Sequence, residues 1–418
     1  MTVNPVRGTS DVFGVEYTYY SKAINDFQKT MQLHGFAGME LPILENKHLY
    51  LETGSDSDIV QKELFTVRSI ASEPDTDSTV LRPEGTISVI RALIASGKID
   101  EKALRVFYAG PMFRYNRPQR GRGRQFTQLG CEIINTTSGE YDAEIISLFA
   151  NFIRKYTNST LHINTIGGLE SRSRYREVLT SFLRANSDKL THLNQLRVES
   201  NVFRVLDQLS TNEKQALSDG LPNIYDHLTH SEQAYFNKLT TILDQLGIKY
   251  YVDKFLIRGL DYYRDTVFEF VQDGLAVAGG GRYSFSRARF DNKQVNIFAT
   301  GAALGLERIL LNYNKNESTA KCVIDASDIV YAYRIQQIVA SLGIIATLNY
   351  GGDPVKYAAK AKAQYIITYD SNDISTEQVR LRCKDSRNTV QLCNLTEHLR
   401  ESLPDLQRIT LDMDDNES

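Results

Sequence analysis

The chain has 418 residues, of which 42% are hydrophobic and 24% are charged, and these ordinary globular values exclude a disordered or collagen-like chain. Lysine and arginine number 48 against 51 aspartates and glutamates, so the formal net charge of −3 excludes a uniformly basic protein but not a local basic cluster. Its length predicts about two to four domains. No stretch approaches the ~18 consecutive apolar residues of a membrane helix, and no secretory signal pattern opens the chain. We therefore expect a soluble, cytoplasmic protein with no membrane partner.

The N-terminal third predicts two helices and a long hairpin. Apolar residues recur every three or four positions over residues 15–33, which indicates one face of a helix, and a strand is expected over 36–44. A second helix is expected after Pro83. Two β-rich runs, 105–114 and 125–134, flank a segment rich in Arg, Gly and Pro, which predicts an antiparallel hairpin with a mobile tip.

The composition changes in the middle of the chain. Residues from about 170 to 246 are rich in Leu, Gln, Asn, Ser and Lys with helical spacing, which predicts an inserted helical module. Strand character returns at 250–257 and 266–271. A turn is expected at 278–281, and a helix is expected to open within 302–311.

The C-terminal part begins after a polar segment, 314–319, that reads as a linker. Beyond it, four strand-like segments alternate with two helical ones, which predicts a small α/β unit with a mixed or parallel sheet. Residues 412–417 are acidic and are expected to be frayed.

The densest chemical signal is a run of arginines at the tip of the predicted hairpin. Five fall within eleven residues that contain no acid: Arg114, Arg117, Arg120, Arg122 and Arg124. Guanidinium groups donate paired hydrogen bonds to phosphate oxygens and stay charged in proteins. A solvated basic loop is the alternative for this segment alone, but its place between two predicted strands favours a phosphate contact.

A second cluster mixes cationic, anionic and phenolic groups. Within residues 257–266 a predicted strand breaks at a glycine, and Arg258, Asp261, Tyr262 and Tyr263 stand side by side. This mixture is uncommon in a pure core. A surface hairpin with local ion pairs is the alternative.

Two glycine-containing motifs are weaker when taken alone. The glycines at 279–281, before Arg282 and Tyr283, would let the backbone lie against a flat ligand, but they are equally typical of a turn. Residues 301–308 predict a helix that is opened by small residues and carries Arg308 in its second turn. Close helix packing is the alternative there.

The predicted helix start after Pro83 offers a carboxylate and a hydroxyl, Glu84 and Thr86, which is also an ordinary capping arrangement. Nothing matches a P-loop or a GxGxxG fingerprint, and the seven histidines show no HExxH or HxH spacing. The four cysteines show no CxxC spacing. A catalytic zinc or a Cys/His nucleophile is therefore not expected, and no metal ligand is assigned.

These motifs, in this order, resemble the histidyl-tRNA synthetase family of class II aminoacyl-tRNA synthetases. Residues 113–132 resemble motif 2 of the class and residues 301–308 resemble motif 3, while the strand at Pro42 with its preceding helix resembles the degenerate motif 1. Residues 258–263 and 280–283 resemble the two peptides specific to the histidine enzyme. The similarity covers nearly the whole chain.

The resemblance implies an α+β fold with a class II antiparallel β-sheet core, flanking helices, an inserted helical domain and a C-terminal α/β anticodon-binding domain. The expected boundaries are 1–169 and 248–313 for the two parts of the catalytic core, 170–247 for the inserted helical domain, 320–405 for the anticodon-binding domain and 406–418 for an acidic tail. A homodimer is implied through motif 1.

The implied activity is that of a histidine–tRNA ligase, with ATP as substrate and Mg²⁺ bridging its distal phosphates. Histidine would be joined to ATP as histidyl-adenylate and then passed to the 3′ end of tRNA(His). Charge develops on the α-phosphate in the first step, so fixed cations aimed there would provide catalysis. By similarity, Arg114 and Arg258 would clamp that phosphate and Arg308 would hold the far end of ATP.

The resemblance also implies a histidine pocket, to which it assigns Glu84, Thr86, Gln128, Glu132, Tyr262 and Tyr263. The first three would receive the α-ammonium group, while Glu132 and Tyr263 would hydrogen-bond the two imidazole nitrogens. Leaving either buried partner unpaired costs about 1–3 kcal/mol, which discriminates against apolar analogues. The arginines at the hairpin tip, Arg117 to Arg124, would meet the tRNA acceptor end, where phosphate contacts set affinity and register.

The chain departs from the family pattern at two places near the expected pocket. Ser284 and Phe285 stand where the family usually has Asp-Gly, and Ala302 stands where it usually has an aromatic residue. These departures leave the predicted polar contacts in place but change the packing around them. The C-terminal unit is also short and divergent.

Two rival functions remain open. The synthetase-like regulatory subunit of ATP phosphoribosyltransferase binds histidine as a sensor, does not aminoacylate tRNA and typically lacks the C-terminal domain. The presence here of Arg114, Arg258, Arg308 and a long segment after motif 3 favours the synthetase. The second rival is a non-catalytic homologue that binds tRNA or another RNA, in which those arginines would have no catalytic role.

Overall fold

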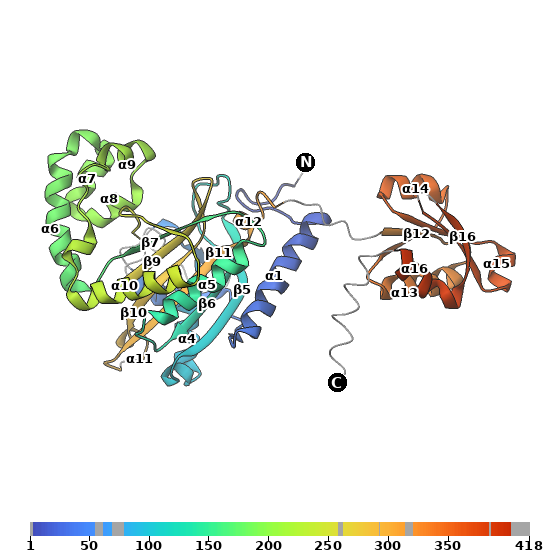
Figure 1. The fold of residues 1–418 in the computed structure, drawn as a ribbon, viewed down its shortest axis with the longest axis horizontal. Helices are drawn as coiled ribbons and strands as arrows, with labels where there is room; N and C mark the ends of the chain where they lie inside the picture. The colour runs from blue at the N-terminus through green and yellow to red at the C-terminus, as the bar shows by residue number, and fades with distance from the viewer. Residues whose placement is uncertain are drawn as a thin grey trace. The chain divides into compact units, whose positions relative to one another are not determined.

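The computed structural model describes residues 3–54, 62–68, 79–257, 262–291, 293–313, 321–383 and 386–402. The chain divides after Tyr313 into an N-terminal unit and a C-terminal unit (Figure 1). The predicted linker, the acidic tail and the residues Arg258 and Asp261 lie outside the described residues. No described helix combines the length and the apolar character needed to cross a membrane.

The N-terminal unit is built on an eight-stranded sheet. Its strand order is β1 (Ala37–Gly38), β5 (Leu104–Phe113), β6 (Gln125–Ile134), β11 (Asn296–Gly305), β10 (Leu275–Ser286), β9 (Tyr263–Gln272), β7 (Thr160–Thr165) and β8 (Tyr250–Val252). Neighbouring strands are antiparallel from β5 to β7, and the two edge pairs, β1 with β5 and β7 with β8, are parallel. This arrangement confirms the predicted class II antiparallel core.

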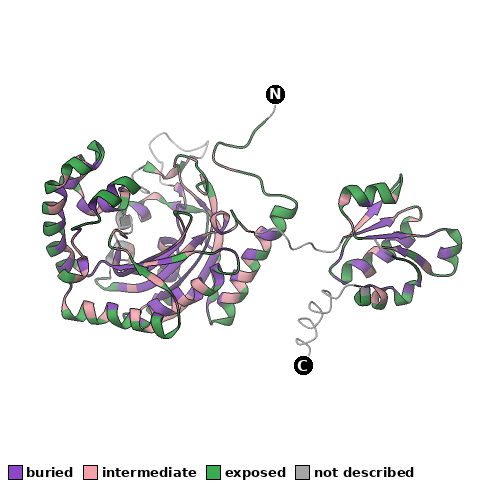
Figure 2. Cartoon of the chain, turned by 45° about the horizontal axis from the view of Figure 1, so that its top comes forward, coloured by how far each residue is buried: buried purple, intermediate pink, exposed green. Residues whose placement is uncertain are grey.

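The central strands of this sheet are largely buried (Figure 2). Both of their faces are covered, because side chains on opposite faces enter two different cores. Phe107 packs in one core with helices α1 (Val15–Leu33), α5 (Glu140–Ile153) and α10 (His230–Gln245). Its neighbour Tyr108 packs in the other with α4 (Thr86–Ala95). Figure 1 shows α1, α5 and α10 lying along the sheet.

The residues predicted as a helical module form five α-helices: α6 (Leu169–Ala185), α7 (His192–Ser200), α8 (Val202–Gln208), α9 (Thr211–Leu217) and α10. Capping boxes begin two of them, because Ser210 and Thr229 each exchange hydrogen bonds with a glutamate three residues later. The buried face of α10 packs with α5 and the sheet, whereas α6 to α9 bury their apolar residues in the core that contains α4.

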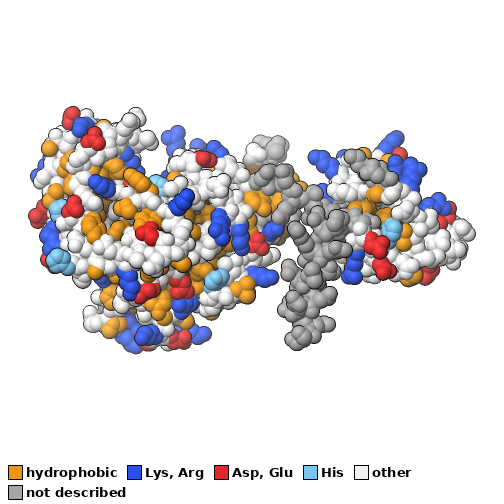
Figure 3. All heavy atoms as spheres, in the orientation of Figure 1, with side chains coloured by type: hydrophobic (Ala, Val, Ile, Leu, Met, Phe, Trp, Pro, Cys, Tyr) orange, Lys and Arg blue, Asp and Glu red, His pale blue; other side chains and the backbone are white. Residues whose placement is uncertain are grey.

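Short elements complete the N-terminal unit. A three-stranded antiparallel sheet pairs β2 (Leu44–Asn46), β4 (Thr79–Leu81) and β3 (Phe65–Val67) in that order. Short helices among the described residues of this unit include α2 (Lys47–Gly54), α11 (Ala288–Asp291) and α12 (Leu306–Ile309). On the face seen in Figure 3, acidic and basic side chains of this unit are interspersed.

Two local predictions in the second half of the sheet are wrong. Residues 278–281 are not a turn but the middle of β10, and residues 301–305 belong to β11, so the helix begins only at Leu306 and carries Arg308 in its first turn. The glycines allow β10 and β11 to pack closely, because a Cβ on Gly280 would lie 2.2 Å from the carbonyl oxygen of Gly301. The strand predicted over 36–44 is also reduced to the two residues of β1 and the start of β2.

The C-terminal unit is the predicted α/β fold; of the two predicted alternatives, a mixed or a parallel sheet, its sheet is mixed, and it has five strands where four are predicted. The strand order is β13 (Ile345–Asn349), β12 (Lys321–Asp325), β14 (Tyr365–Thr368), β15 (Gln378–Arg382) and β16 (Arg387–Gln391). The first three strands are parallel and the last three antiparallel. Its helices are α13 (Ile329–Ser341), α14 (Pro354–Ala361), α15 (Ser371–Ser375) and α16 (Leu395–Ser402).

Candidate active site

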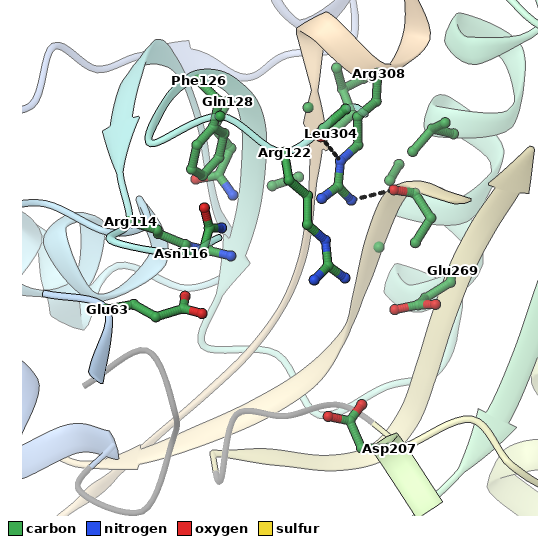
Figure 4. A pocket seen from close by; sticks show the side chains of 18 of the residues that line it. Glu63, Arg114, Asn116, Arg122, Phe126, Gln128, Asp207, Glu269, Leu304 and Arg308 are labelled. Atoms are coloured by element: carbon green, nitrogen blue, oxygen red, sulfur yellow. Dashed lines mark hydrogen bonds between the residues drawn. The ribbon is translucent and has the colours of Figure 1, made fainter. Parts of the chain in front are cut away.

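A cavity of about 660 Å³ lies on one face of the large sheet (Figure 4). The start of β6, the start of β10, the end of β11 and the tip of the β5–β6 hairpin form most of its wall, and α8 of the helical segment lines it as well. Four of the predicted residues line this cavity: Arg114, Arg122, Gln128 and Arg308. The structure therefore brings motif 2 and motif 3 together at one site.

The guanidinium group of Arg114 is held in place at the base of the hairpin tip. Its Nε donates a 2.8 Å hydrogen bond to the carbonyl oxygen of Pro83, and its Cζ lies 5.2 Å from the ring centroid of Phe126. A bond and a stacking partner together restrict a side chain that otherwise has many rotamers. Arg114 is thus preorganised at the cavity wall.

The guanidinium group of Arg308 ties the cavity wall together. Its Nε donates to the carbonyl oxygen of Gly121 at 2.8 Å, and Nη1 donates to that of Ala276 at 2.5 Å (Figure 4). Gly121 belongs to the hairpin tip and Ala276 to β10, so Arg308 links three segments that are distant in the sequence. Figure 4 shows Arg122 and Arg308 near one another in the cavity.

A buried polar cluster lies where α4 begins. The carboxylate of Glu84 accepts hydrogen bonds from the backbone N–H groups of Thr86 at 2.8 Å and Ile87 at 2.9 Å, and burial raises the pKa of Glu84. Gln128 Oε1 accepts from the N–H of Gly85 at 3.1 Å. The predicted ammonium-binding residues Glu84, Thr86 and Gln128 therefore meet at this helix start, and Gln128 connects them to the cavity.

Glu132 is the most enclosed acid of the cluster, with only 1% of its surface exposed. Its Oε1 accepts a hydrogen bond from Thr86 Oγ1 and its Oε2 accepts one from the Tyr283 hydroxyl, both at 2.8 Å. Burial raises the pKa of Glu132 to about 8, although both hydrogen bonds act in the opposite direction. Sequence reasoning missed Tyr283 as the partner of Glu132.

The strand register explains why Tyr283 reaches Glu132 across an intervening strand. Glu132 on β6 pairs with Gly301 on β11, which pairs with Gly281 on β10, and Tyr283 lies two residues further along β10. A Cβ on Gly301 would lie 1.6 Å from Glu132 Oε2. The glycine therefore makes room for the carboxylate, and no local sequence signal identifies this role.

The two predicted tyrosines lie together beside this cluster. Tyr262 and Tyr263 are both buried, with ring centroids 5.0 Å apart. Burial raises the pKa of Tyr262 well above its usual range. Phe285, one of the departures from the family pattern, is buried with its ring 4.8 Å from that of Tyr262. The other departure, Ala302, is buried in β11 opposite Gly280.

Arg282 is separated from the cluster that contains its neighbour Tyr283. It is 2% exposed, donates 2.7 Å hydrogen bonds to Asp142 Oδ1 and to the carbonyl oxygen of Ser138, and also donates to the carbonyl of Thr136. The Tyr235 hydroxyl donates to the other oxygen of Asp142 at 2.6 Å. The buried ion pair between Arg282 and Asp142 joins β10 to the start of α5, and Tyr235 extends the contact to α10. Arg282 therefore stabilises the packing of these elements.

The remaining arginines of the hairpin tip differ in their surroundings. Arg117, Arg120 and Arg122 are exposed, and Arg120 donates to Asn312 Oδ1 at 3.1 Å. Arg124 is half-buried, with its Cζ 3.9 Å from the ring centroid of Tyr115. A basic surface of exposed guanidinium groups therefore borders the cavity.

Sequence reasoning also missed the part of the cavity wall that α8 supplies. Phe203, Arg204, Asp207 and Gln208 line the cavity from the helical segment. Arg258, which was predicted to be catalytic, lies outside the described residues, and Ile257 immediately before it lines the cavity.

The eight-stranded, mainly antiparallel sheet with this cavity on its face has the fold of the class II aminoacyl-tRNA synthetases. A family model described as Histidyl-tRNA synthetase matches residues 8–309, which is well over half of the chain. The chain belongs to the histidyl-tRNA synthetase family.

Solved structures are similar over most of the chain. The apo histidyl-tRNA synthetase of S. aureus matches with a TM-score of 0.71 and 24% identity, covering 95% of this chain and 99% of its own. The histidyl-tRNA synthetase of Nostoc sp. PCC 7120 matches with a TM-score of 0.68 and 14% identity, covering 96% and 100%. A Bacillus halodurans protein described as an ATP phosphoribosyltransferase regulatory subunit/histidyl-tRNA synthetase matches with a TM-score of 0.61 and 20% identity, covering 88% and 98%. At these identities the structural likeness concerns the fold.

Proposed function

We propose that this protein is a histidine–tRNA ligase, which activates L-histidine with ATP and transfers it to the 3′ end of tRNA(His). The observation that carries the proposal is that the cavity and the buried polar cluster at the start of α4 are connected. Arg114 and Arg308 line one cavity, and Gln128 in its wall is hydrogen-bonded to Gly85, between Glu84 and Thr86. A cavity lined by arginines thus adjoins the buried polar cluster at the start of α4.

In the first step, an oxygen of the histidine carboxylate attacks the α-phosphorus of ATP, and the bond to the pyrophosphate leaving group breaks. Negative charge on the α-phosphate is met by cations that are already in place, which lowers the barrier without reorganisation. Arg114 is one such cation and Arg258 is proposed as the second. Arg308 binds the far end of ATP.

Mg²⁺ is expected to accompany ATP and to neutralise charge on its distal phosphates. This ion is usually held by one or two carboxylates together with substrate phosphates. Glu269 and Asp207 line the cavity and supply carboxylates of this kind (Figure 4). The residues present therefore fit a magnesium ion that arrives with the nucleotide.

Histidine is recognised by the buried cluster. Glu84 uses both carboxylate oxygens on backbone N–H groups, but each oxygen retains a lone pair for an ammonium group, and Thr86 and Gln128 lie beside it. Glu132 and Tyr263 bond the two imidazole nitrogens, and Tyr262 closes the pocket with its ring. A side chain without both nitrogens would leave one of these buried groups unpaired.

In the second step the histidyl group passes from the adenylate to the 3′ end of tRNA(His), and AMP is released. The exposed arginines of the hairpin tip contact phosphates of the acceptor end, and the C-terminal unit binds the anticodon. We further propose a homodimer that acts in the cytoplasm. Each of these proposals rests on the family resemblance.

The alternative function is that of a histidine sensor, and the likeness to the Bacillus halodurans protein favours it as the second candidate. Such a sensor would bind histidine in the same pocket without forming an adenylate. The two functions therefore differ in chemistry rather than in histidine binding.

The decisive experiment measures the incorporation of labelled pyrophosphate into ATP with and without histidine, at saturating Mg²⁺. We expect histidine-dependent exchange, which Glu132→Gln abolishes. Glu144→Gln, which alters a half-exposed glutamate paired with Arg105, is the matched control and keeps exchange. Histidine binding without any exchange would contradict the ligase and support the sensor.

A further inference from the structure

At its start, strand β6 directs alternate side chains to the cavity on one face of the sheet and to helix α1 on the other. Phe126 and Gln128 line the cavity. Thr127 lies between them, and because side chains alternate along a strand it faces the opposite side of the sheet, toward α1. There Thr127 Oγ1 shares a hydrogen bond with the hydroxyl of Tyr20 on α1.

Thr127 is also bonded to motif 3. The register of β6 and β11 ends at Gln128 with Gly305, and beyond it the N–H of Thr127 donates a 2.7 Å hydrogen bond to Glu307 Oε1. The carboxylate therefore continues the hydrogen bonding of β6 where the backbone of β11 has turned away. Glu307 directly precedes Arg308.

These contacts matter because α12 has only four residues. A helix of one turn is not stable by itself, so tertiary contacts fix its position. Leu306 and Ile309 are fully buried and hold its apolar side. On its polar side, the Glu307 carboxylate accepts the hydrogen bond from the Thr127 N–H of β6, and Arg308 donates to Gly121 and Ala276. Burial raises the pKa of Glu307 and raises that of Tyr20 to about 12, so the Tyr20 hydroxyl stays protonated over the working pH range.

We propose that Tyr20 is a positioning residue for ATP, which acts through Thr127 and Glu307 to hold Arg308 against the cavity. Tyr20 touches none of the reacting groups. It fixes the hydroxyl of Thr127, the backbone of Thr127 fixes the carboxylate of Glu307, and the position of α12 then sets where the Arg308 guanidinium lies. The proposal rests on the proposed function, in which Arg308 binds ATP.

The test compares Tyr20→Phe, which removes only the hydroxyl, with Tyr17→Phe on the exposed side of the same helix as a matched control. Pyrophosphate exchange gives KM for ATP and for histidine separately, and calorimetric titration with MgATP gives nucleotide affinity without turnover. We expect Tyr20→Phe to raise KM and Kd for ATP about three- to tenfold, the loss typical of one hydrogen bond. KM for histidine and the thermal unfolding midpoint should stay at the values of the control.

Thr127→Val tests the contact between Tyr20 and Thr127 from the other side, because it removes the Thr127 hydroxyl but keeps the N–H that donates to Glu307. It should raise KM for ATP to a similar extent, and the double variant should be no worse than either single variant. ATP affinity equal to that of Tyr17→Phe, or parallel loss of both KM values with a lower unfolding midpoint, would overturn the proposal. Absence of exchange in the wild type would contradict the ligase function instead, and the MgATP titration would still decide the role of Tyr20.

Discussion

The hydroxyl of Tyr283 donates a 2.8 Å hydrogen bond to Glu132 Oε2, across the strand that separates them. Thr86 donates to the other carboxylate oxygen, so two fixed donors orient the group before any ligand is bound. A binding residue whose own position is fixed by neighbours loses less entropy when the ligand arrives. Under the proposed function, Tyr283 and Thr86 would therefore hold the Glu132 carboxylate in position for an imidazole nitrogen.

Tyr283→Phe should weaken histidine binding because Glu132 loses one of its two donors. We expect KM for histidine in pyrophosphate exchange to rise about three- to tenfold, with KM for ATP unchanged. Tyr251→Phe removes the hydroxyl of an exposed tyrosine and is the control. Unchanged KM for histidine would mean that Tyr283 does not support the recognition of histidine.

Glu132 should make the stability of the N-terminal unit depend on pH. Its pKa in the folded protein is about 8, above the ordinary value of 4.5, so the folded state keeps a proton that the unfolded state releases. This contribution is fully present below about pH 4.5 and is lost as the pH rises through 8. Between pH 5 and pH 8 the free energy of unfolding of the wild type should fall more steeply than that of Glu132→Gln, which cannot ionise. Denaturant titrations followed by circular dichroism measure both slopes, and equal slopes would contradict the prediction.

Gly301→Ala should damage the pocket. The new Cβ would lie 1.6 Å from Glu132 Oε2 and 2.8 Å from the carbonyl oxygen of Cys131, so the carboxylate must move. We expect loss of histidine-dependent exchange and destabilisation by about 1–3 kcal/mol. Gly351→Ala is the control, since a Cβ there meets no atom within 4 Å. Normal exchange by Gly301→Ala would show that Glu132 does not need its observed position.

Arg258→Ala should abolish adenylate formation while leaving histidine binding largely intact, because the second phosphate clamp acts on charge that develops in the transition state. Lys254→Ala, which removes an exposed cation four residues earlier, should behave as wild type. Exchange kinetics and equilibrium binding of histidine separate the two effects. Equal loss of both would assign Arg258 a structural role.

Charging of tRNA should weaken as salt concentration rises, because arginines of the hairpin tip would displace counterions from phosphates. Arg117→Ala should lower the slope of log KM for tRNA against log salt by about 1. Arg154→Ala removes an exposed arginine at the end of α5 and should leave the slope unchanged. A KM for tRNA that does not respond to salt would exclude the tip as a contact.

Much of the fold follows from local sequence patterns. The helix over 15–33, the strand over 125–134 and the α/β character of the C-terminal unit are predicted correctly, because periodicity and strand-rich runs indicate these elements directly. Two segments with glycines are mispredicted: residues 278–281 suggest a turn and residues 301–305 suggest the start of a helix, because small residues are typical of both when read locally. Inside a sheet that is buried on both faces, the same glycines allow strands and a carboxylate to approach closely.

The sequence by itself determined which chemical groups the protein has and the family to which its motifs point. A near-neutral total charge concealed a basic segment, and sorting the arginines by position revealed it. Only the tertiary structure decided which of those groups meet. Thr86, Glu132 and Tyr283 come from three segments, and strand register places them together, while Arg282 on the opposite face of β10 enters an ion pair with Asp142. The physical reason is that side chains alternate along any strand, whereas the register between strands depends on the packing of both sheet faces, which involves residues distant in the sequence.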